Sequence, residues 1–159
     1  MPSLNEFSRK KTANLWPITV LRVYTGVFFL KYGYGKLTNP DFADGLAGFV
    51  SGNLEKCFGF MRAFLESVVL PNSALFGFMV TWGELLLGVC LILGLATRYA
   101  AIAGAFMVAM FWFTKGQSLL DAQNHDAIWF VILVTLAAVH AGRVHSLDAK
   151  LAKRYRFLS

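Results

Sequence analysis

The chain has 159 residues, of which 57% are hydrophobic and only 15% are charged, with a formal net charge of +6. A soluble domain usually carries about 25% charged residues, so this composition argues against a water-exposed surface. The apolar residues come in runs too long for a small globular core, and the positive excess is therefore better explained by membrane topology than by nucleic-acid binding.

Four apolar runs predict membrane-spanning helices. A bilayer crossing needs about 20 mainly apolar residues, and the runs occupy residues 16–34, 73–96, 98–114 and 127–141. The last two are slightly short, and we expect them to extend into the interface. None of the runs has the period-2 alternation of barrel strands. We therefore predict an all-α integral membrane protein, a single domain over residues 1–159 built as a four-transmembrane-helix bundle.

The first outer loop, from Gly35 to Asn72, and the C-terminal tail are predicted to form further amphipathic helices. Asn39-Pro40-Asp41 is typical of a helix start, and Asn53 is placed to cap a second helix in the same loop. Such helices lie in the interface plane or fold over the bundle. The tail, residues 146–158, alternates apolar residues with lysines and arginines, which predicts a basic helix on the anionic cytoplasmic leaflet.

Basic residues concentrate on one side of the predicted bundle. The side that carries both termini and the turn at residues 97–99 holds nine of them: Arg9, Lys10, Lys11, Arg98, Arg143, Lys150, Lys153, Arg154 and Arg156. The opposite loops hold four basic residues, offset by six acidic ones. The positive-inside rule therefore predicts a multi-pass protein with both termini in the cytoplasm.

Three charged residues fall inside the predicted spans, namely Arg22, Lys31 and Glu84. A charge at the bilayer centre costs at least a few kcal/mol, so each is expected to have a partner. We predict that Arg22 and Glu84 form a buried ion pair that fixes the register of the first two spans. The alternative is that Glu84 is a proton-linked or ligand-binding carboxylate. Glycines recur beside these charges at helical spacing, which predicts close helix packing.

A polar cluster is expected at the outer ends of the spans. Its members are Lys31, Tyr34, Lys36, Trp82, Lys115, His125 and Asp126. Hydrogen-bond donors with aromatic walls suit a quinone headgroup or a small anion. The alternative is an interfacial aromatic belt with snorkelling lysines, and this alternative is favoured when each residue is considered separately. No metal site is predicted, and Cys57 and Cys90 differ too much in depth to form a disulfide.

Three stretches of the sequence resemble those of a known family. Arg22, Gly26, Phe29, Gly33 and Lys36 form R-x3-G-x2-F-x3-G-x2-K, which is similar to the first-helix signature of the DoxX-like family. The segment from Trp82 to Arg98 resembles that family's second-helix signature, and the ending around Gly142-Arg143 also looks similar. The resemblance implies a four-helix bundle in a bacterial cytoplasmic (inner) membrane. Relatives include membrane subunits of thiosulfate:quinone oxidoreductase and partners in oxidative-stress complexes. The first outer loop is longer here than in ordinary members.

Three functions fit these observations, and the sequence assigns no catalytic residue. The first is a small accessory subunit of a larger redox, electron-transport complex, with membrane lipids and other subunits as partners and no nucleic acid. It would have no intrinsic cofactor, although a quinone or a lipid could bind. The second is a quinone-linked oxidoreductase subunit acting on a small anion such as thiosulfate. The third and weakest is a proton-linked transporter working through Glu84.

Overall fold

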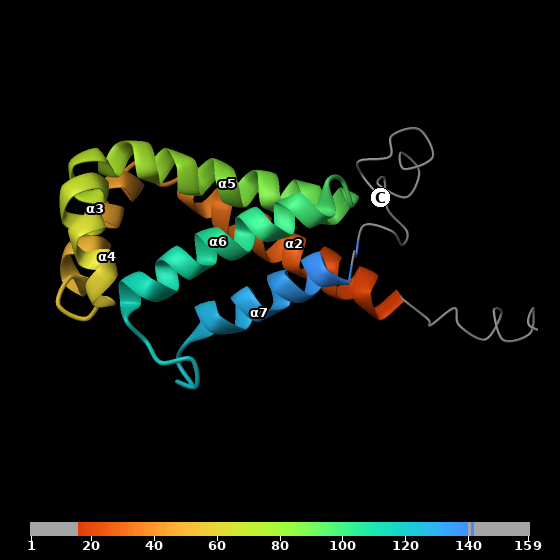
Figure 1. Ribbon diagram of the computed structural model, residues 1–159. Helices are drawn as coiled ribbons and strands as arrows, with labels where there is room; N and C mark the ends of the chain where they lie inside the picture. Colours follow the sequence, from red (N-terminus) through yellow and green to blue (C-terminus); the bar gives the residue numbers. More distant parts are fainter. Residues whose placement is uncertain (1–15, 140, 142–159) are drawn as a thin grey trace, which may run out of the picture.

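A computed structural model describes residues 16–139 and 141, and over these residues the protein is entirely helical apart from its connecting turns (Figure 1). Four long helices make up the body of the molecule: α2 (Trp16–Leu37), α5 (Ser73–Leu93), α6 (Thr97–Lys115) and α7 (His125–Ala138). Between α2 and α5 lie α3 (Phe42–Asn53), α4 (Gly59–Phe64), the π-helical η1 (Leu65–Val69) and the 3₁₀-helical η2 (Leu70–Asn72).

The four long helices coincide with the four predicted spans to within a few residues at each end. The second span was predicted to end at residue 96, but α5 ends at Leu93 because Gly94 adopts a left-handed conformation with φ of 67° and caps it. By length and apolar composition, the continuous helical stretch Gly59–Leu93 can cross a membrane, and α7 is apolar but shorter. The structure therefore confirms an all-helical protein, and among the described residues one helical stretch is both long enough and apolar enough to cross a membrane.

Helices α2 and α5 pack with their backbones in contact. A Cβ added to Gly26 would lie 2.9 Å from the carbonyl oxygen of Gly88, and one added to Gly88 would lie 2.7 Å from the amide nitrogen of Leu30. Only glycine allows so close an approach, which is how small residues bring membrane helices together. The predicted glycine stripes therefore lie at the α2–α5 interface.

The main core lies where α5, α6 and α7 meet α2. Leu91, Leu133 and Leu136 are fully buried there. The side chain of Leu87 fits against Gly104 of α6, where an added Cβ would come within 2.5 Å of it. This interlocking joins the α6–α7 pair to the α2–α5 pair.

The first outer loop folds over one end of the bundle, which is one of the two arrangements expected from its sequence. In Figure 1, α3 and α4 close the end at which α5 and α6 lie far apart. The buried side chains of the loop pack against Phe76 of α5 and against Met110 and Phe111 of α6; they are Leu46, Val50, Met61, Leu65 and Val69.

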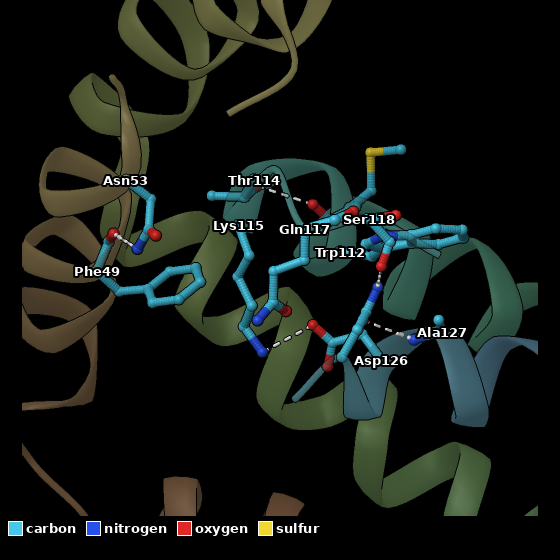
Figure 2. A network of polar contacts seen from close by, with 11 residues as sticks. Phe49, Asn53, Trp112, Thr114, Lys115, Gln117, Ser118, Asp126 and Ala127 are labelled. Atoms are coloured by element: carbon cyan, nitrogen blue, oxygen red, sulfur yellow. Dashed lines mark hydrogen bonds and ion pairs between the residues drawn. The ribbon is translucent and has the colours of Figure 1, made fainter. Parts of the chain in front are cut away.

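The second helix of the first outer loop begins later than the sequence predicts. Asn53 was predicted to cap the second loop helix, but it is the last residue of α3, and its Nδ2 donates to the carbonyl of Phe49 at 2.8 Å (Figure 2). The second helix begins only at Gly59, because residues 54–58 turn the chain toward α6, where Phe58 N donates to Phe113 O at 3.1 Å. The predicted basic helix at residues 146–158 lies outside the described residues.

Candidate functional site

A partly buried ion pair links α2 to α5. Lys36 Nζ donates to Glu84 Oε1, and the Glu84 side chain is only 8% exposed. The ammonium group also lies 5.6 Å from the ring centre of Phe42 and 5.8 Å from that of Phe111, within range of cation–π attraction. The other oxygen, Glu84 Oε2, is buried and has no hydrogen-bond partner among the described residues. A lysine held by a carboxylate and two rings is therefore fixed at the base of the first outer loop.

The ion pair corrects the prediction that Arg22 is the partner of Glu84, because the partner in the structure is Lys36. Arg22 and Glu84 are both buried as expected, but they lie at different heights. Gly33 faces Glu84 and Leu85 across the interface, whereas Gly26 faces Gly88 and Ile92. Arg22 is eleven residues before Gly33, which places it about 16 Å along the helix axis from Glu84. Arg22, 1% exposed, instead donates from Nη1 to the carbonyl of Ala141 at 3.0 Å.

A second polar network shapes the connection between α6 and α7 (Figure 2). Lys115 Nζ lies 2.7 Å from Asp126 Oδ2, which ties the last turn of α6 to the first turn of α7. Trp112 Nε1 donates to the carbonyl of Gln117 at 2.8 Å. Hydrogen bonds from side chains to the backbone therefore help to set the conformation of the loop between α6 and α7.

Asn124 is the residue around which this loop turns. It is fully buried, its Nδ2 donates to the carbonyl of Ser118 at 3.0 Å, and its Oδ1 accepts from the amide of Ala127 at 3.0 Å. The second bond caps α7. Sequence reasoning did not assign this role to Asn124, although an asparagine directly before a predicted helix is the usual signal for a cap.

The structure does not join the seven residues of the predicted outer cluster into one group. Lys36 is paired with Glu84 and Lys115 with Asp126, whereas the other four members are exposed: Lys31, Tyr34, Trp82 and His125. Within the described part of the chain, no hydrogen bond or ion pair joins these four to the two pairs. A quinone or anion pocket formed by all seven residues stays a prediction.

An apolar cavity of about 380 Å³ lies between the first outer loop and helices α5 and α6. It is lined by apolar side chains and by Thr114, and none of the seven predicted cluster residues lines it. The sequence did not predict this cavity, because its walls come from three segments that are distant along the chain. Over residues 16–139 and 141 no group of three or more metal-binding side chains occurs, and Cys57 and Cys90 are not joined by a disulfide.

The helical body, the glycine-mediated α2–α5 contact and the apolar stretch from Gly59 to Leu93 define the class as an all-helical, membrane-associated protein. The particular family follows from comparison with known proteins: the family model described as DoxX matches residues 18–116, which is more than half of the chain, and the chain belongs to the DoxX family. No curated protein and no solved structure gives a significant match.

Proposed function

We propose that this DoxX-family chain is an integral membrane accessory subunit of a larger redox complex, with α2, α5, α6 and α7 all crossing the cell membrane. Large apolar side chains are exposed along these helices, among them Val27 on α2, Leu86 on α5 and Val131 on α7. Leaving such side chains in water would be unfavourable by about 25 cal/mol per Å² of apolar surface. Lipid around four spanning helices would cover them.

The observation that carries the accessory role is the apolar surface at the outer end of the molecule. Leu120, in the loop between α6 and α7, is 92% exposed, and Phe60 on α4 is 67% exposed. The loop and α4 lie at the same end in Figure 1. Apolar side chains grouped at the end of a membrane protein are typical of a surface that a partner covers.

The buried charged groups support the same proposal. Lys36 and Glu84 neutralise each other, and Arg22 binds the carbonyl of Ala141 near the other end of the bundle. Charged groups that bind each other or the backbone hold helices in register, which suits a scaffold. The redox character of the complex rests on the resemblance to DoxX-like subunits that serve quinone-linked oxidation.

The test is purification from native membranes in a mild detergent, followed by mass spectrometry of the co-purifying proteins. We expect redox subunits in fixed ratio with the chain. The double variant Leu119→Asp/Leu120→Asp should lose them, because it places charge on the proposed contact surface. Gln123→Asp is the matched control, since it adds charge to the same loop without removing apolar surface. A wild-type chain that purifies without any partner would contradict the proposal.

A second candidate function is a quinone-linked oxidoreductase subunit that acts on a small anion such as thiosulfate. The observation in its favour is that the Lys115 side chain remains one-third exposed beside Asp126, so its charge can reach an anion arriving from the outer side. Thiosulfate-dependent quinone reduction should be lost in Lys115→Ala but kept in Asp126→Asn, which breaks the ion pair and leaves the cation. Normal turnover in Lys115→Ala would exclude this version.

A further inference from the structure

The apolar cavity owes its shape to the divergence of α5 and α6. The two helices meet at the turn that joins Leu93 to Thr97 and move apart toward the first outer loop (Figure 1). Helices α3 and α4 with η1 close the wide end. The space of about 380 Å³ left between these walls is within the size range of small-molecule sites, roughly 300–1,000 Å³.

The walls of the cavity are almost entirely apolar. Of the sixteen lining residues, only Thr114 is polar, and its hydroxyl donates to the carbonyl of Met110 at 2.8 Å. The carbonyl oxygens of a quinone would therefore find no free hydrogen-bond donor there. The matching occupant is a hydrocarbon chain.

Most methionines of the protein line the cavity. The sequence has five, and all except Met1 line this space: Met61, Met79, Met107 and Met110. Methionine is unbranched and polarisable, so it adapts to apolar ligands of variable shape. Four methionines in one cavity fit a flexible, conformationally variable chain better than a rigid ring.

The cavity is reached from the side of the bundle. Met79 on α5 is 56% exposed and Phe106 on α6 is 66% exposed, whereas Leu46, Val50 and Met61 on the loop side of the cavity are buried. Met79 and Phe106 lie within helices proposed to cross the membrane, so the opening between them faces the lipid. A lipid chain could enter there without leaving the hydrocarbon region.

We infer that this cavity binds one acyl chain of a membrane phospholipid, which fills the space between α5, α6 and the first outer loop. The inference rests on the proposed insertion of α5 and α6 in the bilayer. The bound chain would complete the apolar contacts that the divergence of α5 and α6 leaves unmade, and would fix the loop helices on the bundle.

The inference is tested with the full chain in liposomes that contain a phosphatidylcholine bearing a diazirine near the end of one acyl chain. After irradiation, labelled residues are mapped by mass spectrometry. We expect adducts on the cavity residues Met61 and Met110 as well as on Phe78 and Leu86, which are exposed on α5 outside the cavity. Adducts on Phe78 and Leu86 report membrane insertion independently of the cavity.

The variant Ala103→Trp places an indole at the cavity wall, at an exposed position on α6. Labelling of Met61 and Met110 should fall about tenfold, the effect of excluding roughly two buried methylenes. Ala74→Trp, at an exposed position on α5 away from the cavity, should leave labelling unchanged. Met79→Trp narrows the same opening from the other helix and serves if Ala103→Trp folds poorly.

The labelling pattern distinguishes the acyl-chain site from the proposed membrane insertion. Adducts on Phe78 and Leu86 without adducts on Met61 and Met110 would overturn the acyl-chain site and leave the proposed insertion intact. Failure to label any of the four would overturn both. Cavity labelling by a diazirine-bearing isoprenoid chain but not by the phospholipid would overturn the assignment to an acyl chain.

Discussion

At the scale of single residues, the ion pair between Lys36 and Glu84 is the least exposed of the three ion pairs in the described part of the chain. A buried pair is weak evidence for added stability, because removing two charges from water offsets much of their attraction. Breaking such a pair is different, since one charge then remains buried alone. The rings of Phe42 and Phe111 lie within cation–π range of the Lys36 ammonium group.

We therefore predict that Lys36→Met and Glu84→Met each destabilise the protein by about 3 kcal/mol, and that the double variant regains most of the loss. The measurement is the thermal unfolding of the purified chain in detergent. Glu66→Met is the control, because Glu66 forms an exposed pair with Arg62 whose loss should change stability by less than about 1 kcal/mol. Additive effects of the two single substitutions would show that the pair does not act as a unit.

Gly116 provides a second prediction at this scale. It adopts a left-handed conformation with φ of 63°, and an added Cβ would lie 1.7 Å from the carbonyl oxygen of Lys56. Gly116→Ala must therefore move the backbone of the first outer loop, and it should lower the melting temperature by at least about 5 °C. Gly48→Ala is the control: the position lies within α3 with open space around it, and alanine should stabilise that helix slightly. An unchanged melting temperature for Gly116→Ala would contradict the described contact.

At the scale of helices, the sequence predicted which faces pack but not which residues meet. Gly26 and Gly33 recur at helical spacing on α2, as do Glu84 and Gly88 on α5, and such spacing identifies the faces that form an interface. The vertical register of α2 against α5 depends on the close contact of Gly26 with Gly88, which no single-sequence pattern reveals. The prediction that Arg22 and Glu84 are both buried was therefore correct, but the prediction that they pair was wrong. The two residues are about three helical turns apart along the axis.

The close contact itself is testable. Gly88→Ala would bring a Cβ to 2.7 Å from the amide nitrogen of Leu30 and should push α2 away from α5, with a loss of about 2 kcal/mol or more. Gly35→Ala is the matched control, because that glycine lies in α2 with nothing within 4 Å of the added atom. The two variants are compared by thermal unfolding in detergent, and equal stabilities would argue against the contact.

The loop helices show a different limit of sequence reasoning. The apolar face of α3, with Leu46 and Val50, predicts burial, and both residues are buried. Whether the face rests on lipid or on protein is not decided by the pattern, because either environment removes it from water. In the structure the face of α3 packs on the protein, because α5 and α6 diverge and leave room for it between them. The same divergence leaves the apolar cavity.

At the scale of the whole molecule, the arrangement of α5, α6 and α7 bears on topology. Helix α6 has 19 residues and is therefore about 28 Å long, close to the roughly 30 Å thickness of the hydrocarbon core. The turn before it and the loop after it would then lie on opposite sides of the membrane. The basic residues that orient the protein lie mostly at the two termini, outside the described residues.

Cysteine accessibility tests that arrangement. In a Cys57→Ser/Cys90→Ser background, which removes both native cysteines, single cysteines are introduced at two exposed positions: Tyr99 in the first turn of α6 and Leu120 in the loop that follows α6. With a membrane-impermeant maleimide, Leu120→Cys should react in right-side-out vesicles and Tyr99→Cys only in inverted ones, because the positive-inside rule keeps Arg98 cytoplasmic. The reverse pattern would invert the predicted orientation while preserving the crossing. Reaction of both positions from the same side would show that α6 does not cross the membrane, and the four-span arrangement would then have to be abandoned.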